Sequence, residues 1–445
     1  MMRAMVGAGL MFLLVVPALQ ADEDEAVQRG NKALETRAFT PAPWPFPAYE
    51  NVWKSWLPKL DKAPEEYDRA VQEYYGLHPA PYENGRYPMG LRPGQLLVFK
   101  GLATDCMLCH GGSILGKSYV GLGNASLDIQ AFFEDFNAAA GIGRKLPFTF
   151  SNVRGTSEAG GIAVYLHSFR NPDMTIKLDR HDLKLRDDLC EDVPAWWLLK
   201  KKKTMYHTGG GHARSVRSIM QFMLTPNNTL VTFEKDEPVF KDIQSYLLSL
   251  EAPKYPFPID KDKAAAGEKI FAKTCASCHG TYGKEWTYPN KVVPLKLIGT
   301  DPNRYYGLPK GLADFYNESW FAKEKPEGYK AIETSGYQAP PLDGVWATAP
   351  YLHNGSVPTL YDMLNSKTRP KLFTRSYRTD EASYDKAKVG WKVQLLDEAP
   401  KDATPYERRR VYDTTQPGRG NQGHTFGDDL TEAERWAVVE YLKSL

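Results

Sequence analysis

Two five-residue motifs constrain this chain more than any other feature: Cys106-Met-Leu-Cys109-His110 and Cys275-Ala-Ser-Cys278-His279. Each reads C-x-x-C-H, the sequence to which haem c is covalently attached. Positions i, i+3 and i+4 share one face of a helical turn, so two thiols can form thioethers to a haem edge while the neighbouring imidazole reaches the iron. The sequence therefore predicts two covalently bound haem c groups, with His110 and His279 as axial iron ligands.

Other chemistries of paired cysteines fit the pattern less well. A structural zinc site takes four ligands, commonly from two pairs at short separation, and a thioredoxin-type dithiol does not need the trailing histidine. Here the pairs lie far apart and both carry that histidine. The fifth cysteine, Cys190, is predicted to be a small buried thiol without a catalytic role.

The N-terminus indicates export. Arg3 precedes an apolar run that ends at Leu19, and Ala21 is followed by an acidic stretch, so residues 1–21 are predicted to be a cleaved signal peptide. An uncleaved anchor is the alternative, although the run is short for a bilayer span of about 20 residues. Signal and haem motifs together predict a periplasmic protein. The formal net charge of +2 argues against a nucleic-acid partner.

The chain is predicted to be mainly α, with two cytochrome-c-like haem domains, long irregular loops and an extended N-terminal segment. The wrapping segment spans residues 22–90, the first haem domain residues 91–257 and the second residues 258–445. Short amphipathic helices over Gln95–Asp105 and Ala266–Thr274 are expected to deliver the two haem motifs.

Other predicted elements have specific local signals. Thr431 and Glu434 have the spacing of a capping box and predict the start of a C-terminal helix. Apolar spacing predicts helices over 64–77 and 126–140, and residues 386–393 form a candidate strand or hairpin. Three prolines in residues 251–258 predict a linker without regular helix.

The opposite face of each iron decides the chemistry, because an iron with two protein ligands mostly transfers electrons and an iron with an open face can bind peroxide or dioxygen. For the second haem we expect His353 as the distal ligand, because Pro350, Gly355 and Pro358 make its loop rigid. Met363 is expected to pack in the core and His424 to be exposed to solvent.

No residue stands out as a distal ligand of the first haem. None of the histidines in that part of the chain lies in a motif that demands iron ligation, and an open distal site is predicted. These histidines are His78, His167, His181, His207 and His212.

Four segments carry a resemblance to a known family. They are Ala347–Leu360, Asp192–Trp197, Phe150–Thr156, and the closing pair Gly420–Phe426 and Glu434–Ala437. Together they resemble the bacterial dihaem cytochrome c peroxidase superfamily, which includes the methylamine dehydrogenase maturation enzyme. The closer similarity is to the branch of haem-dependent rubber-oxygenase-like dihaem cytochromes.

The resemblance implies a periplasmic oxidoreductase of peroxidase type. The N-terminal haem would reduce peroxide or activate dioxygen, and a bis-His C-terminal haem would pass electrons from a small donor such as a cytochrome c or a cupredoxin. A pure electron-transfer cytochrome and a rubber-oxygenase-like dioxygenase acting on an unsaturated hydrocarbon are the alternatives. Calcium is known in part of the family, but no acidic cluster gives it a position.

Some further residues are weaker candidates for function. Arg154 and Glu158 follow the first haem motif and are candidates for handling peroxide and protons, although hydrogen bonding by Arg154 to a backbone or haem propionate and a surface position of Glu158 are the simpler expectations. Trp196 and Trp197 are candidates for an electron relay between the haems, with core packing as the alternative.

Overall fold

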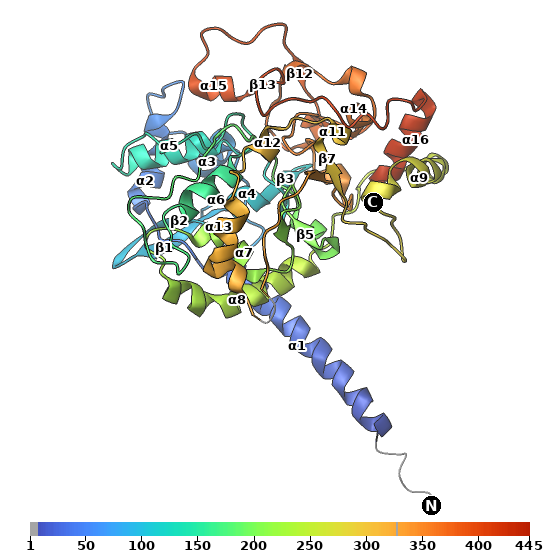
Figure 1. Ribbon diagram of the computed structural model, residues 1–445. Helices are drawn as coiled ribbons and strands as arrows, with labels where there is room; N and C mark the ends of the chain where they lie inside the picture. Colours follow the sequence, from blue (N-terminus) through green and yellow to red (C-terminus); the bar gives the residue numbers. More distant parts are fainter. Residues whose placement is uncertain (1–7, 326–327) are drawn as a thin grey trace, which may run out of the picture.

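The computed structural model describes residues 8–325 and 328–445 (Figure 1). Helices predominate and strands are short. The α-helices before residue 258 are α1 (Ala8–Thr36), α2 (Phe46–Asn51), α3 (Tyr67–Tyr75), α4 (Met107–His110), α5 (Ile129–Ala139), α6 (Ala159–His167), α7 (Val216–Ile219) and α8 (Leu230–Ser249). Those after it are α9 (Lys261–Thr274), α10 (Ala276–His279), α11 (Leu295–Ile298), α12 (Asn303–Tyr306), α13 (Leu312–Glu318), α14 (Leu360–Leu364), α15 (Pro405–Arg409) and α16 (Glu432–Lys443).

The short strands pair into small antiparallel sheets of two or three strands. The two-stranded sheets are β1 (Leu91–Leu96) with β2 (Phe99–Thr104), β3 (Gly111–Ile114) with β4 (Lys117–Val120), β5 (Thr204–Met205) with β6 (Gly211–His212), β7 (Val292–Pro294) with β8 (Gly336–Gln338), and β10 (Tyr384–Asp385) with β11 (Gly390–Trp391). The three-stranded sheet has the order β12 (Gln394–Leu395), β9 (Leu372–Thr374), β13 (Val411–Asp413). The fold is therefore mixed, with more helix than strand, and the β10–β11 hairpin overlaps the strand or hairpin predicted for residues 386–393.

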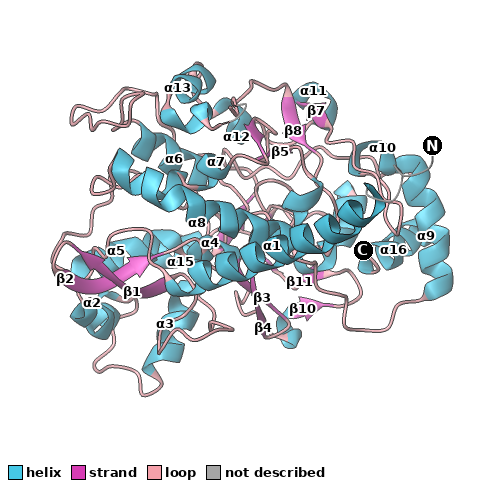
Figure 2. Ribbon diagram, turned by 90° about the horizontal axis from the view of Figure 1, so that it is seen from below, coloured by secondary structure: helices cyan, strands magenta, loops and turns pink. Residues whose placement is uncertain are grey.

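The C-terminal part of helix α1 packs along helix α8 (Figure 2). Gly30 permits the close approach, since a Cβ at this position would lie 2.0 Å from the carbonyl oxygen of Asp242. Arg29 adds an ion pair to the Asp242 carboxylate at 2.9 Å. The predicted signal peptide, residues 1–21, lies partly outside the described residues. No helix within 8–325 and 328–445 is both long and apolar enough to cross a membrane.

The segment that delivers the first haem motif is a β-hairpin, so the helix predicted over Gln95–Asp105 is wrong. Gly101 explains why, because its backbone passes under Trp44 and a Cβ there would lie 2.3 Å from the Trp44 carbonyl oxygen. Arg92, at the base of the hairpin, forms a buried ion pair with Asp105. Packing against the N-terminal segment therefore favours a hairpin here, although the local amphipathic pattern is typical of a helix.

The helix predicted before the second haem motif is confirmed as α9, and it packs on α16. Gly267 lies against the backbone of α16, where a Cβ would be 2.0 Å from the Ala437 carbonyl oxygen. The rings of Phe271 and Tyr441 meet at 5.3 Å. Thr431 and Glu434 form the predicted capping box at the start of α16. This helix pair is the scaffold of the second motif.

Segments after residue 258 also complete the packing of the part before it. Phe321, beyond α13, is fully buried in a cluster with Phe233 and Phe240 of α8. On another side, the ring of Tyr406 in α15 stacks on Tyr74 at 4.4 Å. The segment around residues 366–413 thus packs against the part of the chain before residue 258.

Candidate haem sites

The first haem motif forms one helical turn directly after the hairpin. The amide of His110 donates to the Cys106 carbonyl at 3.0 Å, which places the two cysteines and the histidine on one side of the turn. The Asp105 carboxylate accepts from the Met107 amide at 2.8 Å and holds the start of the turn. Burial raises the pKa of the Cys109 thiol to about 12, so this thiol is protonated before any haem attachment.

The His110 imidazole is held in its neutral form against an aromatic ring. Burial lowers its pKa to about 4, with the Pro194 carbonyl opposing part of the shift. Neutral imidazole is the form that ligates a metal. The Trp196 ring stacks on His110 at 4.7 Å. Gly121 fixes this contact, because its amide donates to the His110 carbonyl and its own carbonyl accepts from the Trp196 amide, each at 2.8 Å.

The second haem motif is also a single helical turn, α10. The amides of Cys278 and His279 both donate to the Cys275 carbonyl, at 3.1 and 3.0 Å. The His279 Nδ1 donates to the Pro340 carbonyl at 2.8 Å. Because Nδ1 carries the proton, Nε2 has the free lone pair that an iron ligand needs. Both motifs therefore have the turn and the neutral imidazole that covalent haem requires.

A second imidazole faces His279. The ring of His424 lies 6.2 Å from the His279 ring, measured between centroids. Two imidazoles on opposite sides of one metal ion, with metal–nitrogen bonds of about 2 Å, have centroids roughly 6 Å apart. Burial lowers the pKa of His424 to about 3, and its Nδ1 is buried. The expectation that His424 is a solvent-exposed side chain is therefore wrong.

Arg369 holds the loop that carries His424. Its guanidinium donates to the carbonyls of Asn421 and Gly423, each at 2.7 Å, and to the carbonyl of His424 at 3.1 Å. His424 has a φ of 46°, in the left-handed region that only a well-fixed loop imposes on a histidine. The amide of His424 also donates to the Ile298 carbonyl at 2.7 Å.

His353, predicted as the distal ligand of the second haem, lies beside another aromatic side chain. It is buried, and its ring stacks on Tyr337 at 4.1 Å. The nearest imidazole with a measured contact is His207, with centroids 6.2 Å apart. Neither of these histidines follows a cysteine pair, and the Nε2 of His207 donates to the Asp192 carbonyl at 2.8 Å. Met363 is partly buried against the core, as expected.

The histidines considered for the first haem have partners elsewhere. His78 bonds Asn124 at 3.1 Å, His181 bonds Asn171 at 3.3 Å, and the ring of His167 lies 4.8 Å from Phe315. His212 stacks on Tyr329 at 4.3 Å. None of these contacts brings a histidine to His110 in the way that His424 is brought to His279.

Arg154 is bonded to protein groups through its whole guanidinium. It donates to the carbonyls of Ser126 and Glu73, at 2.8 and 2.9 Å, and to the Tyr406 hydroxyl at 3.0 Å. These bonds match the simpler expectation of backbone hydrogen bonding and link the two parts of the chain through α15.

Glu158 lies inside the protein, so its expected surface position is wrong. The side chain has no exposed area, and burial raises its pKa to about 7. The carboxylate accepts from the amides of Leu189 and Cys190, at 2.7 and 3.0 Å. The sequence could not show this burial, because the two amides that bond the carboxylate lie more than thirty residues away in the chain. Cys190 itself is buried, as predicted.

Trp196 and Trp197 connect the two haem motifs. Trp196 contacts His110, while Trp197 is buried in the cluster that contains Trp346. The Trp197 indole donates to the Asp343 carbonyl at 2.9 Å, three residues after Pro340. The adjacent tryptophans therefore lie between His110 and the backbone segment 340–343, which accepts from His279, and they also pack the core.

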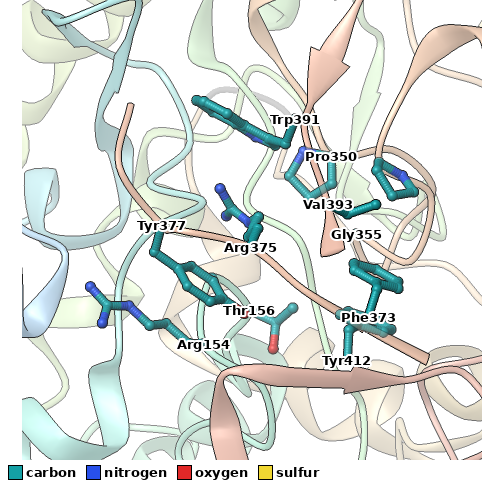
Figure 3. Close-up of a pocket in the computed structure, with 12 residues that line it drawn as sticks. Arg154, Thr156, Pro350, Gly355, Phe373, Arg375, Tyr377, Trp391, Val393 and Tyr412 are labelled. Atoms are coloured by element: carbon teal, nitrogen blue, oxygen red, sulfur yellow. The ribbon is translucent and has the colours of Figure 1, made fainter. Parts of the chain in front are cut away.

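A small cavity of about 20 Å³ lies between the two parts of the chain (Figure 3). Tyr377 lies between two guanidiniums there, 5.0 Å from that of Arg154 and 4.4 Å from that of Arg375. Among the described side chains, no group of three or more His, Cys, Asp or Glu is arranged to hold a metal ion. The position of any calcium stays unassigned.

These sites have the features of a c-type cytochrome, and one comparison supports that class directly. A family model described as RoxA-like, cytochrome c-like matches residues 336–374. That span contains the Pro340 carbonyl that orients His279, and also Tyr337, His353 and Arg369. The match implies haem c and supports the rubber-oxygenase-like branch of the resemblance.

Two curated relatives from Sinorhizobium fredii are similar to part of the chain. The uncharacterized protein y4iM is 31% identical over 232 residues, which cover 46% of this chain and 51% of the relative. The uncharacterized protein y4iJ is 30% identical over 266 residues, covering 44% of this chain and 41% of the relative. The chain thus spans about half the length of the curated relatives it matches.

Proposed function

We propose that this chain is a dihaem c-type cytochrome oxidoreductase with one closed and one open iron. One haem would be attached through Cys106 and Cys109, the other through Cys275 and Cys278. The observation that carries the proposal is an asymmetry: His279 faces a second imidazole at the spacing of a bis-His iron, and His110 does not.

The second haem is proposed to transfer electrons, with His279 and His424 as its iron ligands. His353 was the expected ligand, but the contact with His279 belongs to His424, and His353 stacks instead on Tyr337. An iron closed by two protein ligands mostly transfers electrons, and two imidazoles give a lower potential than imidazole with thioether.

The first haem is proposed to be the reactive one. When bound, it would supply the chemistry of peroxide reduction or dioxygen activation at its open face. The protein groups act by holding His110 neutral and fixing it against Trp196. Arg154 and Glu158 are engaged within the protein, which favours structural roles for both and leaves no assigned proton donor.

Electrons are proposed to pass between the haems by way of Trp196 and Trp197. The path runs from the His279–Pro340 hydrogen bond along the backbone to Asp343, across the hydrogen bond to Trp197, and through Trp196 to His110. A small periplasmic donor, a cytochrome c or a cupredoxin, would reduce the second haem.

Peroxide reduction is the favoured reaction, and it uses both haems. Converting hydrogen peroxide to water consumes two electrons and two protons, and two connected irons can supply the electrons without release of a one-electron product. A dioxygenase acting on an unsaturated hydrocarbon is the second candidate, which the RoxA-like match favours. A pure electron carrier is the third.

Stopped-flow mixing of the half-reduced protein with hydrogen peroxide tests the proposal. We expect the second haem to be oxidised at a rate that saturates with peroxide, and the first haem to bind carbon monoxide when reduced. A protein whose haems both ignore peroxide and carbon monoxide would be an electron carrier. Carbonyl products formed from an unsaturated hydrocarbon and dioxygen, without added reductant, would identify the dioxygenase.

A further inference from the structure

Two buried side chains, His353 and Arg304, each carry a nitrogen atom that no described protein group satisfies. His353 is 8% exposed and Arg304 is 3% exposed. Within the described residues, the Nε2 of His353 and the Nη1 of Arg304 are buried without a hydrogen-bond partner. Leaving such groups unsatisfied costs about 1–3 kcal/mol each, and more for a charged group. This arrangement calls for an acceptor.

Tyr337 connects the positions of the two residues in the fold. Tyr337 stacks on His353, and its hydroxyl accepts from the amide of Tyr305, the residue that follows Arg304. Arg304 also forms a buried ion pair with Glu191 through its Nε, so only part of its fork is used. Burial lowers the pKa of His353 well below the usual range, the charges of His207 and Arg304 add to the effect, and this imidazole stays neutral.

The backbone around Asp192 fixes the histidine side of this pair. The amide of Asp192 donates to the His353 carbonyl at 2.8 Å, and the Asp192 carbonyl accepts from His207. Towards the second motif, Tyr337 precedes Pro340 by three residues and shares an apolar cluster with Cys278. Towards the first, Asp192 is followed by the segment that carries Trp196. The donors therefore lie between the two sites where haem would be attached.

We propose that His353 and Arg304 together bind a carboxylate of haem. Haem c brings carboxylates into the protein interior, and a guanidinium fork with a neighbouring N–H matches the geometry of such a group. His353 would then be a positioning residue for the porphyrin and not an iron ligand. The inference rests on the proposed haem attachment but not on the reaction that the first haem performs.

The test uses the holoprotein with both haems attached. The variants are His353→Gln, and Arg304→Lys, which keeps a cation beside Glu191 and loses the second arm of the fork. His181→Gln is the matched control, because this histidine bonds Asn171. Spectroelectrochemical titration gives the midpoint potential of each haem, resonance Raman spectra give the propionate bending bands, and electron paramagnetic resonance gives the spin states.

In both variants we expect one haem to shift to a lower potential, because a carboxylate with fewer or weaker hydrogen bonds places more negative charge near the iron and favours the ferric state. The propionate band of that haem should shift as well, with haem content and spin state unchanged. A shift of the low-spin haem would assign the carboxylate to the second site, and a shift of the high-spin haem to the first.

Two results would overturn the inference. One is that neither potential nor band moves in either variant. The other is that His353→Gln converts the low-spin haem to high spin, which would make His353 an iron ligand. Because potentials are measured without turnover, an absence of peroxidase activity would refute the proposed reaction and leave this inference standing.

Discussion

The imidazoles of His279 and His424 face each other with their centroids 6.2 Å apart, although 145 residues separate them in the chain. This spacing leaves room for one iron between them. We therefore predict that His424→Ala turns the second haem from low to high spin while both haems stay attached, and that His353→Ala leaves it low spin. Electron paramagnetic resonance of the ferric proteins measures the difference. The opposite pattern would restore His353 as the ligand.

The loop that carries His424 is held by Arg369, so the proposed ligand role of His424 depends on this arginine. Each hydrogen bond from a charged donor contributes about 1.5–3 kcal/mol, so losing those to Asn421, Gly423 and His424 should loosen the loop. We predict that Arg369→Ala gives a mixture of low- and high-spin second haem, and that added imidazole restores the low-spin form. Arg378→Ala, at an exposed position nearby in the chain, is the control. A wholly low-spin variant that ignores imidazole would exclude this positioning role.

If electrons pass through Trp196 and Trp197, substitutions at these positions should change the rate of electron transfer between the haems. Trp197→Phe keeps an aromatic ring but loses the hydrogen bond to Asp343, and Trp196→Leu loses the ring on His110. Both variants should slow oxidation of the second haem by peroxide, several-fold for Trp197→Phe and more for Trp196→Leu. Stopped-flow absorbance follows this step, with Trp53→Phe as the control. Unchanged rates in both variants would leave the pair with a packing role only.

The burial of Glu158 makes stability depend on pH. Its pKa is about 7 in the folded protein and near 4.5 when unfolded, so between these values the unfolded chain releases a proton that the native state keeps. Its contribution to the free energy of unfolding is thus present below the unfolded pKa and is lost as pH rises through 7, by up to about 3 kcal/mol.

Urea unfolding of wild type and Glu158→Gln at about pH 5 and about pH 8 measures this contribution. The variant should lose less stability than wild type between the two pH values. Glu65→Gln, at a side chain that is 91% exposed, should behave as wild type. Equal pH dependence in wild type and Glu158→Gln would mean that Glu158 ionises normally inside the protein.

Local sequence signals predicted the parts of the site that local geometry determines. The C-x-x-C-H turns, helix α9 and the capping box of α16 each depend on residues a few positions apart, and the structure has all of them. The hairpin β1–β2 could not be predicted in this way. It depends on the close packing of Gly101 against the backbone of Trp44, a residue far away in the sequence.

The choice between His353 and His424 also lay beyond local signals. The rigid loop around His353 is real, with Asn354 and Ser356 fully buried, and within it the His353 ring stacks on Tyr337. His424 follows a glycine in a polar stretch, and its loop is fixed by distant partners, the Arg369 guanidinium and the Ile298 carbonyl. Partners distant in sequence position both histidines, and the motif spacing contains no information about them.

The central claim is tested most directly by the spin states of the two haems. Electron paramagnetic resonance measures them in the resting ferric protein, and absorbance spectra of the reduced protein under carbon monoxide show which haem binds this ligand. The account predicts one high-spin and one low-spin haem, and a carbon monoxide complex at one haem only. Two low-spin haems with no response to carbon monoxide would contradict it.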